Sequence, residues 1–233
     1  MQFRLKTAPN YALRYQNLTR AYGSAEGTWV TLENNCARAV LTANLLNISV
    51  SSAETLLRSC PLSVSLRSFF RRLSEGELAH PVVDKAVMMR LRAMFHLQTL
   101  MSEQCLELSH KGINWDELQR YLVESLDGRV RETFMAVFLG PHHEFIASEI
   151  LFSGSVDRAC VHHRVVVTRA LSHQAVSIVV AHNHPSGSLI PSAADIETTR
   201  KLARCLKLVD IALADHVIVA SGRCESLRNL GFV

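Results

Sequence analysis

The sequence predicts an α+β or mixed α/β fold, in which a small all-helical domain precedes a mixed sheet that is flanked by helices. Two observations support this prediction. Apolar residues recur at spacings of three and four through much of residues 31–108, as in amphipathic helices. After residue 128, runs rich in β-branched residues alternate with helical segments, as in a sheet with helices on its faces. The expected division is a helical domain over residues 1–112 and an α/β domain over residues 113–233.

The first half is expected to be helical after an irregular lead-in over residues 1–30, which show no clear period. The expected helices run from about Thr31, over Glu54–Arg58, over Ser65–Leu73, from Pro81 to about Leu108, and over Asp116–Leu126. In the Ser65–Leu73 helix, the apolar residues are predicted on one face. Arg67, Arg71 and Arg72 are predicted on the opposite face.

The second half is expected to contain a hairpin and then alternating helices and strands. In order, these are strands over Arg131–Leu139 and Glu144–Phe152, a helix over Val161–Ser172, a strand over Val176–Ala181, a helix over Ser192–Val209 and a strand over Asp215–Ala220. In such folds the carboxyl end of a strand that leads into a helix is the usual place for a site.

Composition indicates an ordinary globular protein of the cytoplasm, with no membrane partner. Nearly half of the 233 residues are apolar and a fifth are charged. No apolar run approaches the ~18 residues that a membrane span needs, and Met1–Lys6 lacks the apolar core of a signal peptide. The six cysteines form no C-x-x-C pair, which favours reduced thiols over a disulfide framework.

Positive charge is concentrated in the first half of the chain. Residues 1–112 hold 13 Lys and Arg against 8 Asp and Glu, a net charge of +5, whereas residues 113–233 hold 12 against 13. A basic half leaves nucleic acid open as a partner, and an ordinary solvated surface is the alternative.

Two histidines and one aspartate have the spacing of metal ligands. His182 and His184 end a predicted strand, where residues two apart face the same side. Asp195 follows one turn into the next predicted helix. Two histidines and a carboxylate supply three zinc ligands and leave a fourth position for water, which is the pattern of a catalytic zinc site. A polar strand end that binds no metal is the alternative.

Ser192 and Asp195 also have a structural interpretation. A serine followed three residues later by an acidic residue at a helix start is close to a capping box. Capping and chemistry both remain open for these two residues.

The spacing His182-x-His184-Pro185, then Ser192, then Asp195 resembles the JAMM motif of MPN-domain metalloproteins. The sequence His-Asn-His-Pro-Ser-Gly, followed by Pro-Ser-x-x-Asp, is most similar to that of the RadC (UPF0758) branch. The resemblance covers about residues 114–233, including Gly154–Asp157, Asp215–Val219 and Glu225–Leu227. It implies an MPN-like fold and a zinc-dependent hydrolase that acts on a peptide or isopeptide bond in a protein or peptide substrate.

The resemblance also implies a glutamate that holds the attacking water, and Glu132 is the matching residue. Glu144 and Glu149 are the other nearby carboxylates, and Glu149 is the second choice. Zinc lowers the pKa of a bound water to roughly 7, and a carboxylate beside it can pass the proton to the leaving amine. The hydroxyl of Ser192 is the candidate for stabilising the oxyanion together with zinc.

The chain departs from the RadC branch in two places. The branch has Pro-Arg-Glu where this chain has His163-Arg164-Val165, which puts substrate choice or even activity in question. The helix-hairpin-helix region reads Gly76–Val83, with one glycine and no Gly-x-Gly, so packing or partner docking is expected there in place of DNA binding. The alternative function is that of a DNA-associated accessory protein of the RadC type with a structural or vestigial metal site.

Other histidines are not expected to bind metal. Cys160, His162 and His163 are ligand types, but at a helix start they are not expected to converge as a second site. His216, beside Asp215 at a strand start, is expected to be a hydrogen-bonded structural residue.

Overall fold

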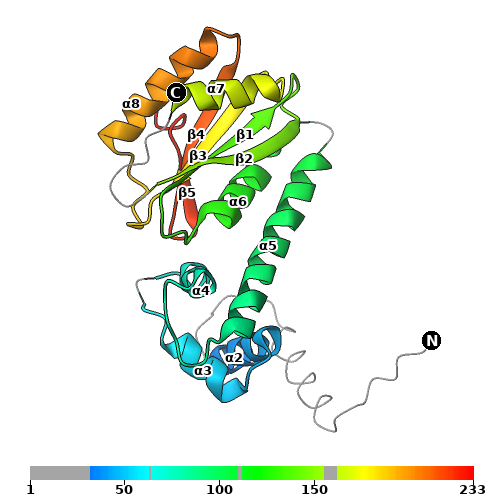
Figure 1. Ribbon diagram of the computed structural model, residues 1–233, viewed down its shortest axis with the longest axis vertical. Helices are drawn as coiled ribbons and strands as arrows, with labels where there is room; N and C mark the ends of the chain where they lie inside the picture. Colours follow the sequence, from blue (N-terminus) through cyan, green and yellow to red (C-terminus); the bar gives the residue numbers. More distant parts are fainter. Residues whose placement is uncertain (1–31, 63, 110–111, 155–161) are drawn as a thin grey trace, which may run out of the picture. The chain divides into compact units, whose positions relative to one another are not determined.

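The computed structural model describes residues 32–62, 64–109, 112–154 and 162–233, with side chains from residue 38 onward (Figure 1). The expected irregular lead-in over residues 1–30 lies outside this part. The contacts divide the chain into two compact units, Met1–Pro61 and Leu62–Val233. No helix in the described ranges is both long and apolar enough to cross a membrane.

The first unit contributes two described helices, α2 (Leu32–Leu46) and α3 (Val50–Arg58), which pack through small side chains. Ala39, Ala43 and Ala53 are buried between them. The helix α3 begins four residues before the predicted Glu54, because Ser49 caps it by accepting a hydrogen bond from the Ser52 N–H.

The second unit is built around a five-stranded mixed sheet with the strand order β2-β1-β3-β4-β5 (Figure 1). Its strands are β1 (Thr133–Leu139), β2 (Phe145–Ser153), β3 (Ser177–Asn183), β4 (Ala212–Ala220) and β5 (Arg223–Ser226). Only β3 and β4 pair in parallel; the other neighbours are antiparallel. The short edge strand β5 was not predicted, because four residues after a tight turn carry too little pattern.

Helices cover both faces of this sheet. The helix α6 (Trp115–Leu126) packs on one face, against the odd-numbered residues of β1 and β3 such as Val137 and Val179. The helices α7 (His163–Ser172) and α8 (Ala193–Lys207) pack on the other face, against Phe138 and Val180. Because β1 and β3 are buried on both faces, they are apolar over most of their length. The predicted mixed sheet flanked by helices is thus confirmed.

The helices α4 (Leu66–Glu75) and α5 (Lys85–Glu107) belong to the second unit by their contacts. The predicted start of α5 at Pro81 is wrong. The helix begins after Asp84, whose carboxylate accepts a hydrogen bond from the Val87 N–H at 2.8 Å and so caps the first turn.

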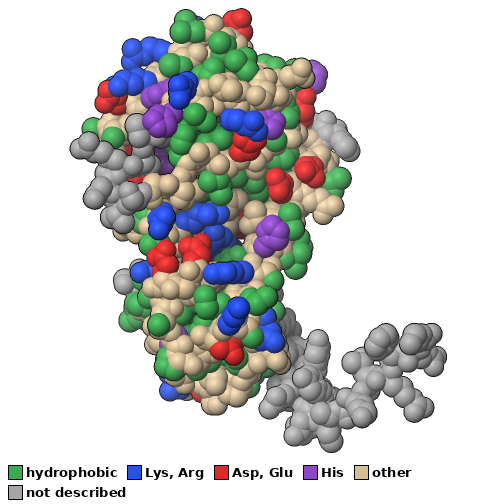
Figure 2. Space-filling model, in the orientation of Figure 1, with side chains coloured by type: hydrophobic (Ala, Val, Ile, Leu, Met, Phe, Trp, Pro, Cys, Tyr) green, Lys and Arg blue, Asp and Glu red, His purple; other side chains and the backbone are tan. Residues whose placement is uncertain are grey.

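Arg71 of α4, predicted opposite the apolar face of its helix, is buried. It is 5% exposed, and its guanidinium donates to the backbone carbonyls of Ser125 and Glu124 in the last turn of α6. Burial, and then the nearby charge of Arg129, lower the pKa of Arg71 to about 10. This arginine therefore docks α4 on α6, where carbonyls at a helix end favour positive charge. Figure 2 shows basic and acidic side chains intermixed on the face in view.

Candidate metal centre

Three side chains converge at the carboxyl end of β3. His182 is the penultimate residue of β3, and His184 is the first residue after the strand. Asp195 lies in the first turn of α8. The Nε2 atoms of the two histidines are 2.9 Å apart. Asp195 places Oδ1 3.2 Å from Nε2 of His182 and Oδ2 3.4 Å from Nε2 of His184. In the described ranges, this is the group of His, Cys, Asp and Glu residues whose ligand atoms lie within 4.8 Å of one another.

These donor atoms fit a small tetrahedral cation. Metal–ligand distances of about 2.0–2.1 Å separate tetrahedral donors by roughly 3.3–3.4 Å, close to the separations here. The Nδ1 atom of His184 lies 2.8 Å from the carbonyl oxygen of Ser188, which can only accept a hydrogen bond. Nδ1 therefore carries a hydrogen, and Nε2, which faces Asp195 and His182, is the nitrogen that a metal would take. Two imidazole nitrogens and a carboxylate are the donor types that zinc binds.

Asp195 serves the helix and the cluster at once. Its Oδ2 accepts a hydrogen bond from the Ser192 N–H at 2.7 Å, and Ser192 Oγ accepts one from the Asp195 N–H at 3.2 Å, which completes a capping box. Burial opposes ionisation of this carboxyl, but hydrogen bonds with His182 and His184 outweigh it and hold its pKa well below the usual range. The hydrogen bond to Asp195 in turn raises the pKa of His184.

Glu132 lies beside the cluster because of the β1/β3 register. Phe134 pairs with His182 in this antiparallel ladder, so two residues further along Glu132 comes opposite His184. The Asn183 side chain fixes this end of the ladder: its Oδ1 accepts a hydrogen bond from the Thr133 N–H at 2.9 Å, and its Nδ2 donates to the Arg129 carbonyl. The negative charge of Glu132 makes a smaller contribution to the raised pKa of His184, after that of Asp195.

The other two candidate carboxylates lie elsewhere. Glu149 of β2 forms an ion pair with Arg169 and lies 2.8 Å from His173, both on the α7 side of the sheet. These partners lower the pKa of Glu149 to about 2, first through the Arg169 hydrogen bond. Glu144 accepts a hydrogen bond from the His142 N–H in the β1–β2 turn. Of the three glutamates, only Glu132 is placed at the histidines.

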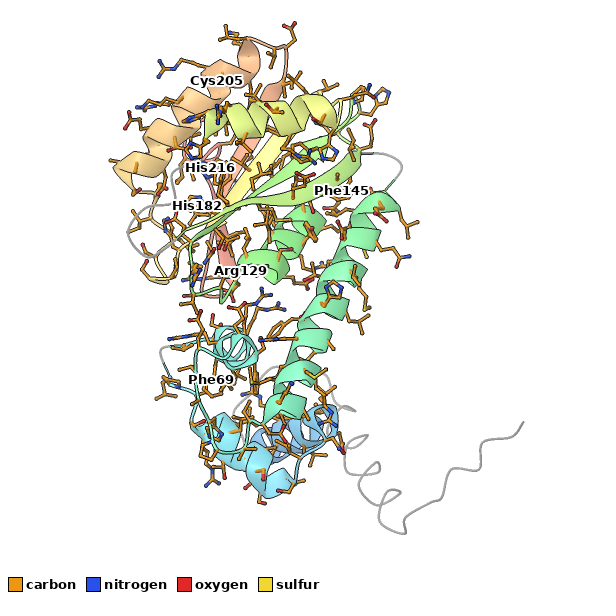
Figure 3. All side chains as sticks on the ribbon, viewed as in Figure 1. Phe69, Arg129, Phe145, His182, Cys205 and His216 are labelled. Atoms are coloured by element: carbon orange, nitrogen blue, oxygen red, sulfur yellow. The ribbon has the colours of Figure 1, made fainter. Side chains whose placement is uncertain are left out.

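His216 and Thr199 lie directly behind the cluster, and Thr199 was not among the predicted site residues. His216 of β4 is buried, and its Nε2 lies 2.8 Å from Nδ1 of His182 (Figure 3). Its Nδ1 lies 2.6 Å from the hydroxyl of Thr199 on α8. Burial first, and then the charge of His182, lower the pKa of His216 well below its ordinary value. As expected, His216 is hydrogen-bonded inside the fold.

Residues around the start of α7 do not add to the cluster. His162 precedes α7 without a side-chain capping bond and His163 is its first residue, while Cys160 lies outside the described residues. Arg164 is exposed on the first turn of the helix.

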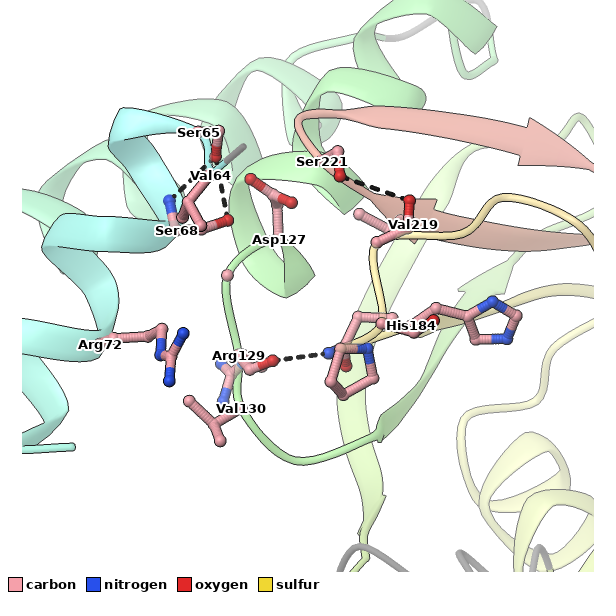
Figure 4. Close-up of a pocket in the computed structure, with 15 residues that line it drawn as sticks. Val64, Ser65, Ser68, Arg72, Asp127, Arg129, Val130, His184, Val219 and Ser221 are labelled. Carbon is pink, nitrogen blue, oxygen red and sulfur yellow. Dashed lines mark hydrogen bonds between the residues drawn. The ribbon is translucent and has the colours of Figure 1, made fainter. Parts of the chain in front are cut away.

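A cavity of about 410 Å³ adjoins the cluster on the side of His184 (Figure 4). One wall is the loop Asn183–Gly187, and the facing wall is the start of α4, with Ser65, Ser68 and Arg72. Arg129 and the loop that leads into β1 close it between these walls (Figure 4). The walls are polar and charged, so the cavity suits a polar ligand beside the cluster.

Comparison with known proteins agrees with this architecture. A sequence model described as the RadC-like JAB domain matches residues 113–232. A UPF0758 protein of Vibrio parahaemolyticus is 36% identical over 169 residues, which cover 72% of this chain and 75% of the relative. UPF0758 proteins of Stenotrophomonas maltophilia (44% identical; 54% of this chain, 56% of the relative) and Xanthomonas campestris (48% identical; 49% and 51%) are also similar. The chain therefore belongs to the RadC-like JAB-domain family of UPF0758 proteins.

Proposed function

We propose that the chain is a zinc-dependent metallohydrolase that cleaves a peptide or isopeptide bond. The observation that carries this proposal is the convergence of three donor atoms from His182, His184 and Asp195 at the end of β3, with separations that suit zinc. When bound, zinc supplies a Lewis acid that polarises a carbonyl group and makes a water acidic near pH 7.

Glu132 is proposed as the general base. The β1/β3 register, continued two residues beyond the Phe134–His182 pair, supports a position near His184, from which the carboxylate would accept a proton from the attacking water and return it to the leaving amine. The hydrogen bond from Thr133 to Asn183 fixes the backbone directly after Glu132. This attachment limits how far the carboxylate can move between the two proton transfers.

Ser192 is proposed to stabilise the oxyanion. Its Oγ accepts the Asp195 N–H, which leaves the hydroxyl hydrogen free to donate to a substrate oxygen. The capping bond fixes the position of Oγ at the start of α8, beside the ligand Asp195. A donor held in place before the reaction stabilises developing negative charge most effectively.

A protein or peptide is the proposed substrate. The cavity beside His184 is lined by hydroxyls, arginines and exposed backbone, which can contact an extended polypeptide on both sides. His184 belongs both to the cluster and to the lining of the cavity, which supports binding of the substrate beside the cluster.

The test uses the full chain, loaded with one equivalent of zinc and incubated with a library of proteome-derived peptides that includes ε-linked lysine conjugates. New amino termini and released amines are read by mass spectrometry. Wild type is expected to cleave some members, and Glu132→Gln is expected to keep zinc while the rate falls by about 10²–10⁴. Glu149→Gln, the matched control, is expected to cleave at the wild-type rate.

Two outcomes contradict the proposal. One is a folded protein that takes up no zinc when the metal is supplied. The other is a Glu132→Gln variant that cleaves as fast as wild type, which would leave Glu132 without the proposed role.

A further inference from the structure

A chain of hydrogen bonds starts at Nδ1 of His182, on the opposite side of the ring from Nε2, which faces the cluster. Nδ1 of His182 lies 2.8 Å from Nε2 of His216, and Nδ1 of His216 lies 2.6 Å from Oγ1 of Thr199. The Thr199 hydroxyl donates at 2.6 Å to the backbone carbonyl of Asp195. The three side chains are at most 1% exposed, so solvent does not compete for these bonds.

The direction of every bond in this chain follows from its last member. A carbonyl oxygen only accepts, so the single hydroxyl hydrogen of Thr199 is donated to the Asp195 carbonyl. The Thr199 oxygen must then accept a hydrogen bond from Nδ1 of His216. A neutral imidazole that donates from Nδ1 accepts at Nε2, so Nε2 of His216 is an acceptor in this chain. It therefore accepts from Nδ1–H of His182, which leaves Nε2 of His182 as the nitrogen available to a metal.

The chain also closes a ring between two of the proposed ligands. Thr199 donates to the backbone of Asp195, and the carboxylate of Asp195 lies 3.2 Å from Nε2 of His182, where the chain started. The ring thus joins β3, β4 and the first turns of α8. His184 lacks this arrangement, because its Nδ1 bonds the Ser188 carbonyl within an exposed loop.

We propose that His216 and Thr199 are positioning residues for the metal centre: they hold His182 in the tautomer and orientation that a metal requires and fix Asp195 relative to it. This inference rests on the proposed zinc site. Hydrogen-bonded partners of metal-binding histidines typically change metal affinity by about 10–100-fold when removed. Loss of the Thr199 hydroxyl leaves His216 without its acceptor, so His216 can turn its proton toward His182 and force the proton of His182 onto Nε2.

The experiment measures zinc affinity of the full chain by competition with a chromophoric chelator, together with the visible spectrum of the cobalt-substituted protein. Thr199→Val is expected to weaken zinc binding by about 10–100-fold and to alter the cobalt bands, whereas Thr199→Ser, which keeps the hydroxyl, stays within about threefold of wild type. Thr198→Val, the same change one residue earlier on α8, is the matched control and is expected to bind like wild type.

A second pair keeps the test decisive if Thr199→Val does not fold. His216→Gln can offer an amide oxygen to His182 and is expected to bind zinc more tightly than His216→Leu, which offers none. Equal zinc affinity in Thr199→Val and wild type would overturn the inference, as would a loss in Thr199→Ser as large as in Thr199→Val. If Thr199→Val lowers only the Tm of the metal-free protein, the role is structural and the inference is wrong. Failure of wild type itself to bind zinc would instead contradict the proposed function.

Discussion

The carboxylate of Asp195 lies 3.2 Å from Nε2 of His182, although a strand end, a turn and a helix start separate them in the chain. The same carboxylate accepts a hydrogen bond from the Ser192 N–H through its other oxygen. One side chain thus caps α8 and faces the histidines, and the sequence could not decide between these two roles because the geometry allows both together.

Substitution of Asp195 should separate the two roles. Asp195→Asn keeps an oxygen for the Ser192 N–H but removes the negative charge, so we expect a Tm close to wild type and a zinc affinity at least about tenfold lower. Asp195→Ala should lose both functions, with about 1 kcal/mol of stability lost with the cap. Thermal unfolding of the metal-free variants and chelator competition measure the two effects. Wild-type zinc affinity in Asp195→Asn would exclude this carboxylate as a ligand.

Substitution of Ser192 should separate its role in capping α8 from its proposed role in stabilising the oxyanion. Ser192→Asp retains a side-chain oxygen that can cap α8 but, when ionised, has no hydrogen to donate, so we expect unchanged stability, retained zinc and slower cleavage. Ser192→Ala should show the same slower cleavage and also lose about 1 kcal/mol of stability. Urea unfolding and the cleavage assay distinguish the variants. Full activity in Ser192→Ala would assign Ser192 to capping alone.

Local pattern was sufficient to predict that the side chains of His182, His184 and Asp195 converge. His182 and His184 follow a recognisable strand, Asp195 follows a recognisable helix start, and a strand that leads into a helix brings these two ends together. Glu132 is brought toward His184 by the antiparallel β1/β3 register when it is continued two residues beyond the Phe134–His182 pair, and its role as base stays a prediction.

Contacts between distant segments were beyond prediction from the sequence. The bond between His182 and His216 depends on the parallel pairing of β3 with β4, and that between Thr133 and Asn183 depends on the end of the β1/β3 ladder. Helical period placed Arg71 opposite the apolar face of its helix but could not show its partners, because the carbonyls that it binds belong to α6, about 50 residues later. The separate helical domain over residues 1–112 and a role for it in binding nucleic acid stay predictions.

Glu149 should contribute to stability in a pH-dependent way. Arg169 and then His173 lower its pKa to about 2 in the folded chain, against roughly 4.3 when unfolded. Because the folded pKa is depressed, the contribution is complete above about pH 4.5 and is lost as the pH falls toward 2. Glu149→Gln should therefore lower the Tm at pH 7 by roughly 1–3 °C, a small effect because the pair is partly exposed. The difference from wild type should shrink between pH 4.5 and 3. A difference that grows on acidification would contradict this assignment.

Gly128 should control how closely α4 docks on the sheet domain. It has φ +78°, and a Cβ atom at this position would lie 2.6 Å from Cα of Ser68 on α4. Gly128→Ala therefore combines left-handed backbone strain of about 1–2 kcal/mol with a clash against backbone, and α4 must shift to relieve it. We expect a loss of at least about 3 kcal/mol in urea unfolding and faster amide hydrogen exchange along α4.

The matched control for Gly128 is Gly222, which has φ +73° and open space around the position of a Cβ atom. Gly222→Ala should lose only the strain of about 1–2 kcal/mol and leave exchange in α4 unchanged. The start of α4 forms a wall of the cavity beside His184, so Gly128→Ala should also raise KM for a cleaved peptide more than Gly222→Ala does. Equal losses of stability in the two variants, with no change in α4 exchange, would show that the close approach to Ser68 does not hold α4 in place.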